Sequence, residues 1–167
     1  AGLWIFGPHG LDVGLHLDDH GFHRTLKDAT WRQAWPHIRD YVPGRNLHVV
    51  YTVALYKIFG SDPVRLHAAG LFFDLLNVLL FFVLLLQRGY GSRWALAAAG
   101  LFLVYPNHAE THYWTTSIAM NLMSTTFLLA AFLWIGSGRF SPALRGAGAF
   151  TLYLLALFDY DQVFFMW

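Results

Sequence analysis

The chain of 167 residues contains no cysteine and few charged residues. Without cysteine, it can form neither a disulfide framework nor a thiolate metal site. Charged residues make up 13% of the chain, whereas a typical soluble domain contains about 25%. The formal net charge is only +1, so the chain lacks the excess of positive charge that nucleic-acid binding requires, and we expect no nucleic-acid partner.

The chain is instead strongly apolar, with 56% hydrophobic residues and 18% aromatic residues. Its longest apolar run, AAGLFFDLLNVLLFFVLLLQ from Ala68 to Gln87, contains one charge. A helix of this length crosses a hydrocarbon layer of about 30 Å. We therefore predict an integral membrane protein with the lipid bilayer as its main partner. Since the chain starts at Ala1 and ends in the apolar sequence FFMW, we also expect further residues beyond both ends.

Four apolar segments are predicted to span the membrane, at about residues 66–87, 94–105, 117–135 and 143–158. Because a spanning segment must satisfy its own backbone hydrogen bonds, and no alternating strand pattern is present, we predict an all-α, polytopic fold. Residues 1–65 then form a polar region on one side of this transmembrane bundle. Within that region, residues 46–60 predict an interfacial, buried or re-entrant helix whose apolar face contains Leu47, Val50, Ala54 and Ile58.

Arginine predicts the orientation. Arg88 and Arg93 share one short loop, Arg139 and Arg145 share another, and four antiparallel spans place both loops on the same side. By the positive-inside rule that side is the cytoplasm. The acidic loops then face the periplasm or exterior of a bacterial cytoplasmic membrane. Seven of the eleven Lys and Arg residues precede the first span on the proposed outer side, an exception that long segments tolerate.

The stretch HLDDHGFHRT, residues 16–25, contains the first candidate site. Asp18 and Asp19 are adjacent, so on a helix they diverge by about 100° and cannot act on one atom. One could accept a proton from a hydroxyl nucleophile while the other holds a metal or a cation. His16 and His20 could complete a divalent metal site. The alternative is a solvated helix start with Asp as the N-cap and interfacial histidines that only form hydrogen bonds.

Two further places carry candidate groups. The loop PNHAETHYW, residues 106–114, contains His108 and Glu110; the alternative interpretation is an interfacial cap whose aromatic residues anchor it in the membrane. Asp74 lies inside the first predicted span, where a carboxylate is costly and is expected to be functional or paired. Asn77 follows one turn later and could form a hydrogen bond with it or with another helix. Asp159 and Asp161 add carboxylates after the last span.

The order of these motifs resembles the integral-membrane C-type (GT-C) glycosyltransferases, which include protein O-mannosyltransferases and bacterial lipid A sugar transferases. In that family an acidic pair lies in the first outer loop, the place that Asp18 and Asp19 occupy here. Two segments resemble the branch that has tetratricopeptide repeats and its bacterial relatives. They are residues 45–67, RNLHVVYTVALYKIFGSDPVRLH, and the Pro-x-His-x-Glu segment at 106–110. The resemblance covers most of residues 18–135, the N-terminal portion of the family's pattern.

This resemblance implies transfer of a sugar from a polyprenyl-phosphate donor to a hydroxyl acceptor on the outer face. Asp19 or Asp18 would be the general base. Inverting transfer also needs cations that stabilise the departing phosphate, and Arg45, Arg24 and His108 are the candidates, with Glu110 as a further substrate-binding residue. The cofactor is left open, with a divalent metal ion as the candidate.

Several departures from the family leave alternatives open. The family usually has many more spans and a first span before the acidic pair, and Asp74 stands where a neutral residue or His is common. The alternative function is a noncatalytic small subunit of a larger membrane complex, built on a degenerate glycosyltransferase scaffold, which could hold haem or a pigment through its histidines. A third hypothesis is a transporter fragment with Asp74 as a proton site.

Overall fold

The structure is a computed structural model, and it describes residues 18–26, 28–41, 45–60, 62–104 and 118–159. Helices are the only regular elements within these ranges, which confirms the all-α prediction for them. The elements, in chain order, are α3 (Asp18–Leu26), α4 (Trp31–Tyr41), α5 (Asn46–Phe59), α6 (Pro63–Gln87), α7 (Ser92–Val104), the π-helical segment η2 (Ile118–Met123), α9 (Ser124–Ile135) and α10 (Pro142–Asp159).

The turn between α5 and α6 follows directly from its sequence. Gly60 ends α5 with φ 70°, a backbone conformation that side chains disfavour. Asp62 then caps α6, because its carboxylate accepts a hydrogen bond of 3.0 Å from the Val64 amide. Pro63 occupies the first turn of α6, where no amide donor is needed. The chain therefore reverses sharply, and α6 begins next to the end of α5.

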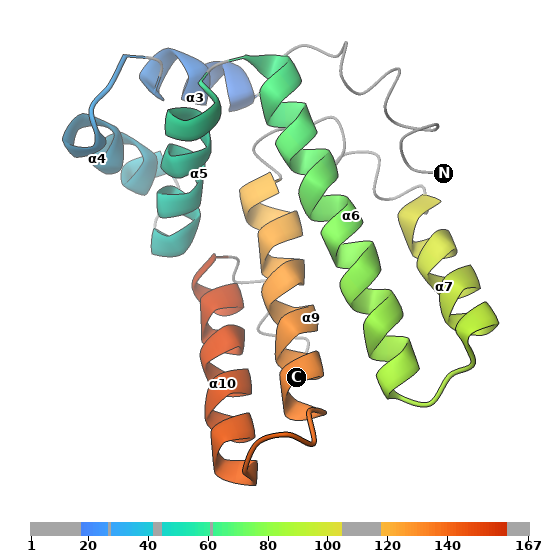
Figure 1. The fold of residues 1–167 in the computed structure, drawn as a ribbon. Helices are drawn as coiled ribbons and strands as arrows, with labels where there is room; N and C mark the ends of the chain where they lie inside the picture. Colours follow the sequence, from blue (N-terminus) through green and yellow to red (C-terminus); the bar gives the residue numbers. More distant parts are fainter. Residues whose placement is uncertain (1–17, 27, 42–44, 61, 105–117, 160–167) are drawn as a thin grey trace.

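Helices α10, α9, α6 and α7 lie side by side in a row, in which α6 and α9 run in one direction and α7 and α10 in the opposite one (Figure 1). Each packs against its neighbour in the row, α10 on α9, α9 on α6 and α6 on α7. As a result, the α6–α7 turn with Arg88 and the α9–α10 turn with Arg139 lie at the same end of the row. Helices α3, α4 and α5 gather at the opposite end, where α6 begins.

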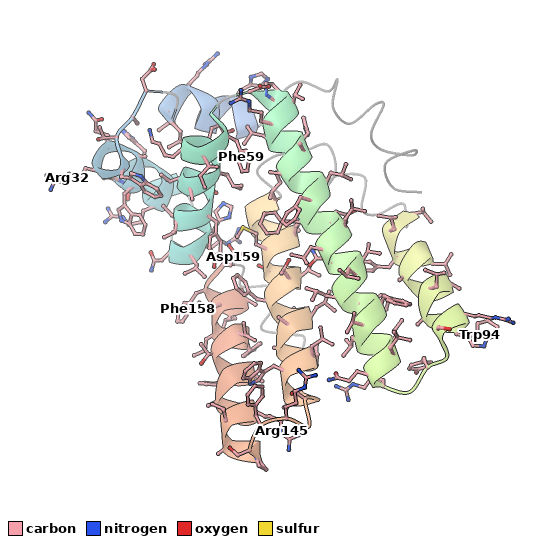
Figure 2. The ribbon with its side chains drawn as sticks, viewed as in Figure 1. Arg32, Phe59, Trp94, Arg145, Phe158 and Asp159 are labelled. Carbon is pink, nitrogen blue, oxygen red and sulfur yellow. The ribbon has the colours of Figure 1, made fainter. Side chains whose placement is uncertain are left out.

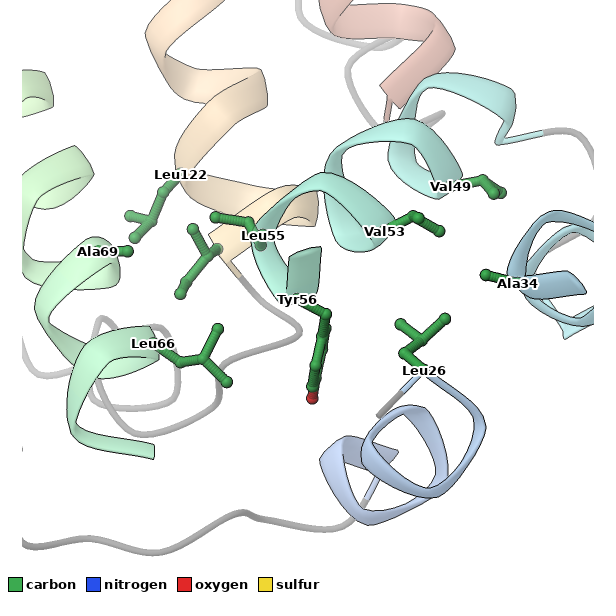
Figure 3. Close-up of a cluster of buried hydrophobic side chains, with 10 residues drawn as sticks. Leu26, Ala34, Val49, Val53, Leu55, Tyr56, Leu66, Ala69 and Leu122 are labelled. Atoms are coloured by element: carbon green, nitrogen blue, oxygen red, sulfur yellow. The ribbon is translucent and has the colours of Figure 1, made fainter. Parts of the chain in front are cut away.

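A cluster of buried hydrophobic residues joins these three helices to the row (Figure 3). On α5, Val49 and Val53 are fully buried and face Ala34 of α4, while Tyr56 lies near Leu26 of α3. Their spacing of four and three residues places them on one side of the helix. On another side of α5, Leu55 is directed toward the start of α9 and α6. Thus α5 is the element that fixes α3 and α4 on the bundle.

The buried face of α5 differs from the face that the sequence predicts. Ile58, predicted to lie on the apolar face, is 70% exposed, whereas His48, which the pattern leaves at the edge of that face, is fully buried. The reason is that α5 packs on two sides, against α4 and against α10 and η2. A helix that is apolar almost all round carries no clear signal for which side packs, so periodicity alone misplaced His48.

Of the described helices, α6 alone is long and apolar enough to cross a membrane; α7 and the segment Asn121–Ile135 are apolar but shorter. Large apolar side chains remain exposed along the row, including Phe72 and Leu79 on α6 and Trp94 and Leu101 on α7. Trp94 projects away from the bundle (Figure 2). These surfaces are typical of helices that face a hydrophobic medium or other helices.

Candidate functional site

A buried polar cluster lies where α5, α10 and α9 meet. It consists of His48, Asp159 and Ser124, whose exposed fractions are 0%, 0% and 2%. Ser124 Oγ donates a hydrogen bond of 2.7 Å to Asp159 Oδ2. His48 Nδ1 lies 3.9 Å from Asp159 Oδ1, too far for a direct hydrogen bond. Figure 2 shows Asp159 at the end of α10, close to the ends of α5 and α9.

Burial decides the protonation of this cluster. It lowers the pKa of His48 to about 4, helped by the positive charge of Arg45. Burial also raises the pKa of Asp159, which lies just beyond the span predicted at 143–158, to about 7, although the Ser124 hydrogen bond and Arg45 oppose this shift. Between these values the pair holds one proton, on Asp159, while His48 is neutral. Between these two pKa values the three side chains of the cluster are therefore uncharged, and Arg45 provides the neighbouring positive charge.

The geometry limits what chemistry this cluster can perform. In a nucleophilic triad the histidine lies between serine and the carboxylate, so that it can take the serine proton. Here Asp159 lies between Ser124 and His48, and the Ser124 hydroxyl donates a hydrogen bond to the carboxyl group. Neither His48 nor Asp159 is exposed to solvent. The arrangement is suited to holding a proton inside the protein and is not suited to attack on a substrate.

A second buried polar cluster joins α6 to the start of α9. Asn77 Nδ2 donates a hydrogen bond of 2.9 Å to the Leu122 carbonyl oxygen. The Thr126 hydroxyl lies 2.7 Å from Asn77 Oδ1 and 2.8 Å from the same carbonyl oxygen. Leu122 belongs to the π-helical segment that leads into α9, and its carbonyl oxygen accepts hydrogen bonds from side chains of both α6 and α9. Asn77 therefore forms a hydrogen bond with another helix, one of the two roles its sequence position predicts.

An apolar groove of about 690 Å³ separates α5 from α6. The two helices meet at the Gly60 turn and diverge, with the start of α9 between them (Figure 1). Tyr51, Ile58, Phe72 and Met123 are among its lining residues, and Arg65 is the charged one. The Tyr51 ring, which lines this groove, stacks on Phe127 with a centroid distance of 5.9 Å. The pKa of Tyr51 is raised to about 12, first by burial and then by the charge of Asp159, which places the groove next to the first cluster.

The predicted site residues are distributed as follows. Asp18 and Asp19 are the first two residues of α3. Arg24 is exposed on the same helix, and Arg45 precedes α5, close enough to lower the pKa of His48. All four belong to the α3–α5 end of the molecule. Asp74 is fully buried in α6, one turn before Asn77.

His20 is exposed on α3. His16, His108, Glu110 and Asp161 lie outside the described residues. Within the described ranges, no three His, Asp or Glu residues are close enough to hold a metal ion together. The divalent metal site remains a prediction.

Sequence reasoning missed His48 and Ser124 as members of a site. Asp159 was recognised as a carboxylate at a helix end, but its partners lie 35 and 111 positions earlier in the chain. The available signal was weak: a histidine and a serine, each in a strongly apolar helix, are candidates for a shared buried contact. Only the packing of α5 against α10 identifies which carboxylate they share.

No protein-family model, curated protein or solved structure matches this chain significantly. The likeness to the membrane glycosyltransferases therefore rests on the motifs of the sequence.

Proposed function

We propose that the chain is part of a polytopic membrane glycosyltransferase that transfers a sugar from a polyprenyl-phosphate donor to a hydroxyl acceptor on the outer face of a bacterial cytoplasmic membrane. The observation that carries this proposal is the gathering of α3, α4 and α5 at one end of the helix row, opposite the two turns that contain Arg88 and Arg139. The acidic pair, Arg24 and Arg45 thus share one side of the protein.

The membrane embedding is supported by α6. Between Arg65 and Arg88 the sequence contains a single charged residue, Asp74. At about 1.5 Å per residue this stretch is about 35 Å long, slightly more than the hydrocarbon layer of about 30 Å. Arginine at both ends suits the two headgroup regions, because its long side chain can reach the interface. The other three helices of the row, α7, α9 and α10, run alongside α6 and would lie in the same layer.

The orientation follows from the charges at the two ends of the row. Arg88 and Arg139 occupy the turns at one end, and Arg93 lies in the first turn of α7; short loops rich in arginine remain in the cytoplasm. Helix α3, which begins with Asp18 and Asp19, then lies outside. Negative charge is favoured in the first turn of a helix by the helix dipole, and Asp18 and Asp19 are the candidate bases.

The proposed reaction assigns a role to each group. Asp19 or Asp18 takes the proton of the acceptor hydroxyl, whose oxygen forms a bond to the anomeric carbon of the donor sugar. The bond from that carbon to the phosphate oxygen breaks, and its electron pair leaves with the polyprenyl phosphate. Arg45, Arg24 and His108 are proposed to stabilise the departing phosphate, and Glu110 to bind substrate.

The test is transfer by the membrane-inserted protein from synthetic polyprenyl-phosphate hexoses, measured as release of free polyprenyl phosphate. We expect Asp18→Asn or Asp19→Asn to lower the rate by at least about 100-fold, the usual contribution of a general base. Asp28→Asn is the matched control, because Asp28 is an exposed aspartate just after α3, and it should leave the rate unchanged. Full activity in both Asn variants would contradict the proposal.

A second candidate is a noncatalytic subunit of a larger membrane complex, which could include haem or a pigment. The observation that favours it is the exposed apolar surface of α7, which includes Trp94, Leu96 and Leu101. Another side of α7 packs against α6. Partner helices could cover this surface. Wild-type protein that inserts correctly, releases no polyprenyl phosphate and copurifies with defined membrane subunits would favour this second function.

A further inference from the structure

The groove between α5 and α6 has the properties of a lipid-binding site. Its lining is almost wholly apolar, with Tyr51, Ile58, Phe72 and Met123 on its walls. Ile58 and Phe72 are 70% and 60% exposed, so the groove is open to its surroundings. A volume of about 690 Å³ is within the usual range for ligand sites of about 300–1,000 Å³. An extended peptide would leave its backbone groups without hydrogen-bond partners on such a surface, whereas a hydrocarbon chain would not.

The groove continues into a stripe of exposed apolar residues along α6. Phe72, Leu79, Val83 and Leu86 are each at least 40% exposed, and their spacings of seven, four and three residues place them on one face of the helix. Arg65, seven residues before Phe72, lies on the same face. From Arg65 to Leu86 this face extends about 31 Å, close to the hydrocarbon thickness of about 30 Å. A lipid beside α6 would therefore present its chain to the stripe and its headgroup to Arg65.

Arg65 is able to bind a phosphate group. Its Nε atom pairs with Asp62 Oδ2 at 3.3 Å, on the side of the α5–α6 turn. Both side chains are exposed, and an exposed ion pair of this kind contributes little to the stability of the fold. Within the described residues no hydrogen bond engages the two terminal Nη atoms, which form the fork that arginine uses to bind phosphate. The charge and the apolar groove together match an anionic lipid.

We propose that this groove binds one acyl chain of an anionic phospholipid from the outer leaflet, with the phosphate held by Arg65. The inference rests on the membrane embedding proposed above, but not on the transferase chemistry. The bound lipid would fill the space between α5 and α6 below the Gly60 turn and hold α5, with His48 and Arg45, in place against α10.

The test uses the full chain, purified in a mild detergent and titrated with phosphatidylglycerol or with phosphatidylcholine of the same acyl chains. Native mass spectrometry measures how many lipids stay bound. We expect one phosphatidylglycerol to bind at least about tenfold more tightly than phosphatidylcholine, the factor that one charge-assisted contact provides. Arg65→Gln should abolish that preference. Ala68→Trp, at an exposed alanine of the lining, should block the groove and lower the affinity for both lipids.

Arg139→Gln is the matched control, because Arg139 is an exposed arginine at the opposite end of the row, and it should change neither affinity. Circular dichroism verifies that each variant keeps its helical content. Equal binding of the two lipids by the wild type, or unchanged binding by both groove variants, would overturn the proposal while leaving the transferase hypothesis standing. Protein that is recovered in the soluble fraction would overturn the membrane embedding itself.

Discussion

The two buried polar clusters differ in how completely their groups are paired. At the α6–α9 contact, the amide of Asn77, the carbonyl of Leu122 and the hydroxyl of Thr126 are joined by hydrogen bonds. At the junction of α5 and α10, His48 Nδ1 and Asp159 Oδ1 have no hydrogen-bond partner within the described structure. A fully paired cluster stabilises one arrangement of its helices, whereas a partly paired one leaves a proton that can move.

The difference matters because of where the clusters lie. The paired cluster joins two helices of the row that are proposed to cross the membrane. The other cluster joins α5, which supports the proposed outer active region, to the end of α10. We infer that the first has a structural role, and that the second makes the attachment of the outer helices sensitive to protonation. Four predictions test this contrast, in order of decreasing effect.

The largest effect is expected from separating His48 and Asp159 by mutation. In Asp159→Asn, His48 is left with a folded-state pKa below its ordinary value of 6.5, near 4. The unfolded chain then binds a proton that the folded chain does not. The free energy of unfolding is therefore highest above pH 6.5 and decreases as the pH falls toward 4. The full loss is about 3 kcal/mol. Thermal unfolding in detergent, followed by circular dichroism, measures it.

The reciprocal variant should show the opposite slope. In His48→Gln, Asp159 keeps a folded-state pKa raised from 3.8 to about 7, so its stabilising contribution is present at low pH and is lost as the pH rises through 7. In the wild type the folded and unfolded chains each hold one proton on this pair between about pH 4 and 6.5, and the two slopes cancel. Slopes of the same sign in both variants would contradict the protonation assigned to the pair.

Mutations in the paired cluster should lower the free energy of unfolding by an amount that does not depend on pH. Asn77→Leu keeps a similar shape and leaves the Leu122 carbonyl and the Thr126 hydroxyl without the amide of α6. We expect a loss of about 1 kcal/mol, the usual net contribution of a hydrogen bond, because the Thr126 hydroxyl and the Leu122 carbonyl still bond to each other. Thr126→Val should cost less, because the hydrogen bond from Asn77 to Leu122 remains. The same unfolding measurement, repeated at pH 5 and pH 8, should give equal losses.

The smallest effect concerns the contact that positions α10, and with it Asp159. A Cβ atom at Gly148 would overlap the Trp134 indole, which donates a hydrogen bond of 3.2 Å to the Leu144 carbonyl. Gly148→Ala should therefore destabilise the α9–α10 contact by about 1 kcal/mol or more, despite the better helix propensity of alanine. Gly146→Ala is the matched control, since a Cβ there meets nothing within 4 Å. That variant should be stabilised or unchanged.

The helices could be predicted well from local sequence. The Gly60–Pro63 turn and the four apolar segments contain the signals that start and end helices, and helices occupy 63–87, 92–104, 118–135 and 142–159. The clusters could not be predicted, because they depend on which faces pack. Helix α5 is apolar on several sides, so its pattern could not show that His48 faces Asp159, which is 111 residues away. The π-helical segment that contains Leu122 also has no sequence signal.

The proposed function requires most of all that the two ends of the helix row face opposite sides of a membrane. Since the chain contains no cysteine, single variants give an unambiguous readout with a membrane-impermeant maleimide in intact bacterial cells. Asp28→Cys, between α3 and α4, should be labelled from outside. Gly138→Cys, in the α9–α10 turn, should be labelled only after the cells are permeabilised. Labelling of both positions, or of Gly138→Cys alone, in intact cells would contradict the proposed topology and the outer-face active region.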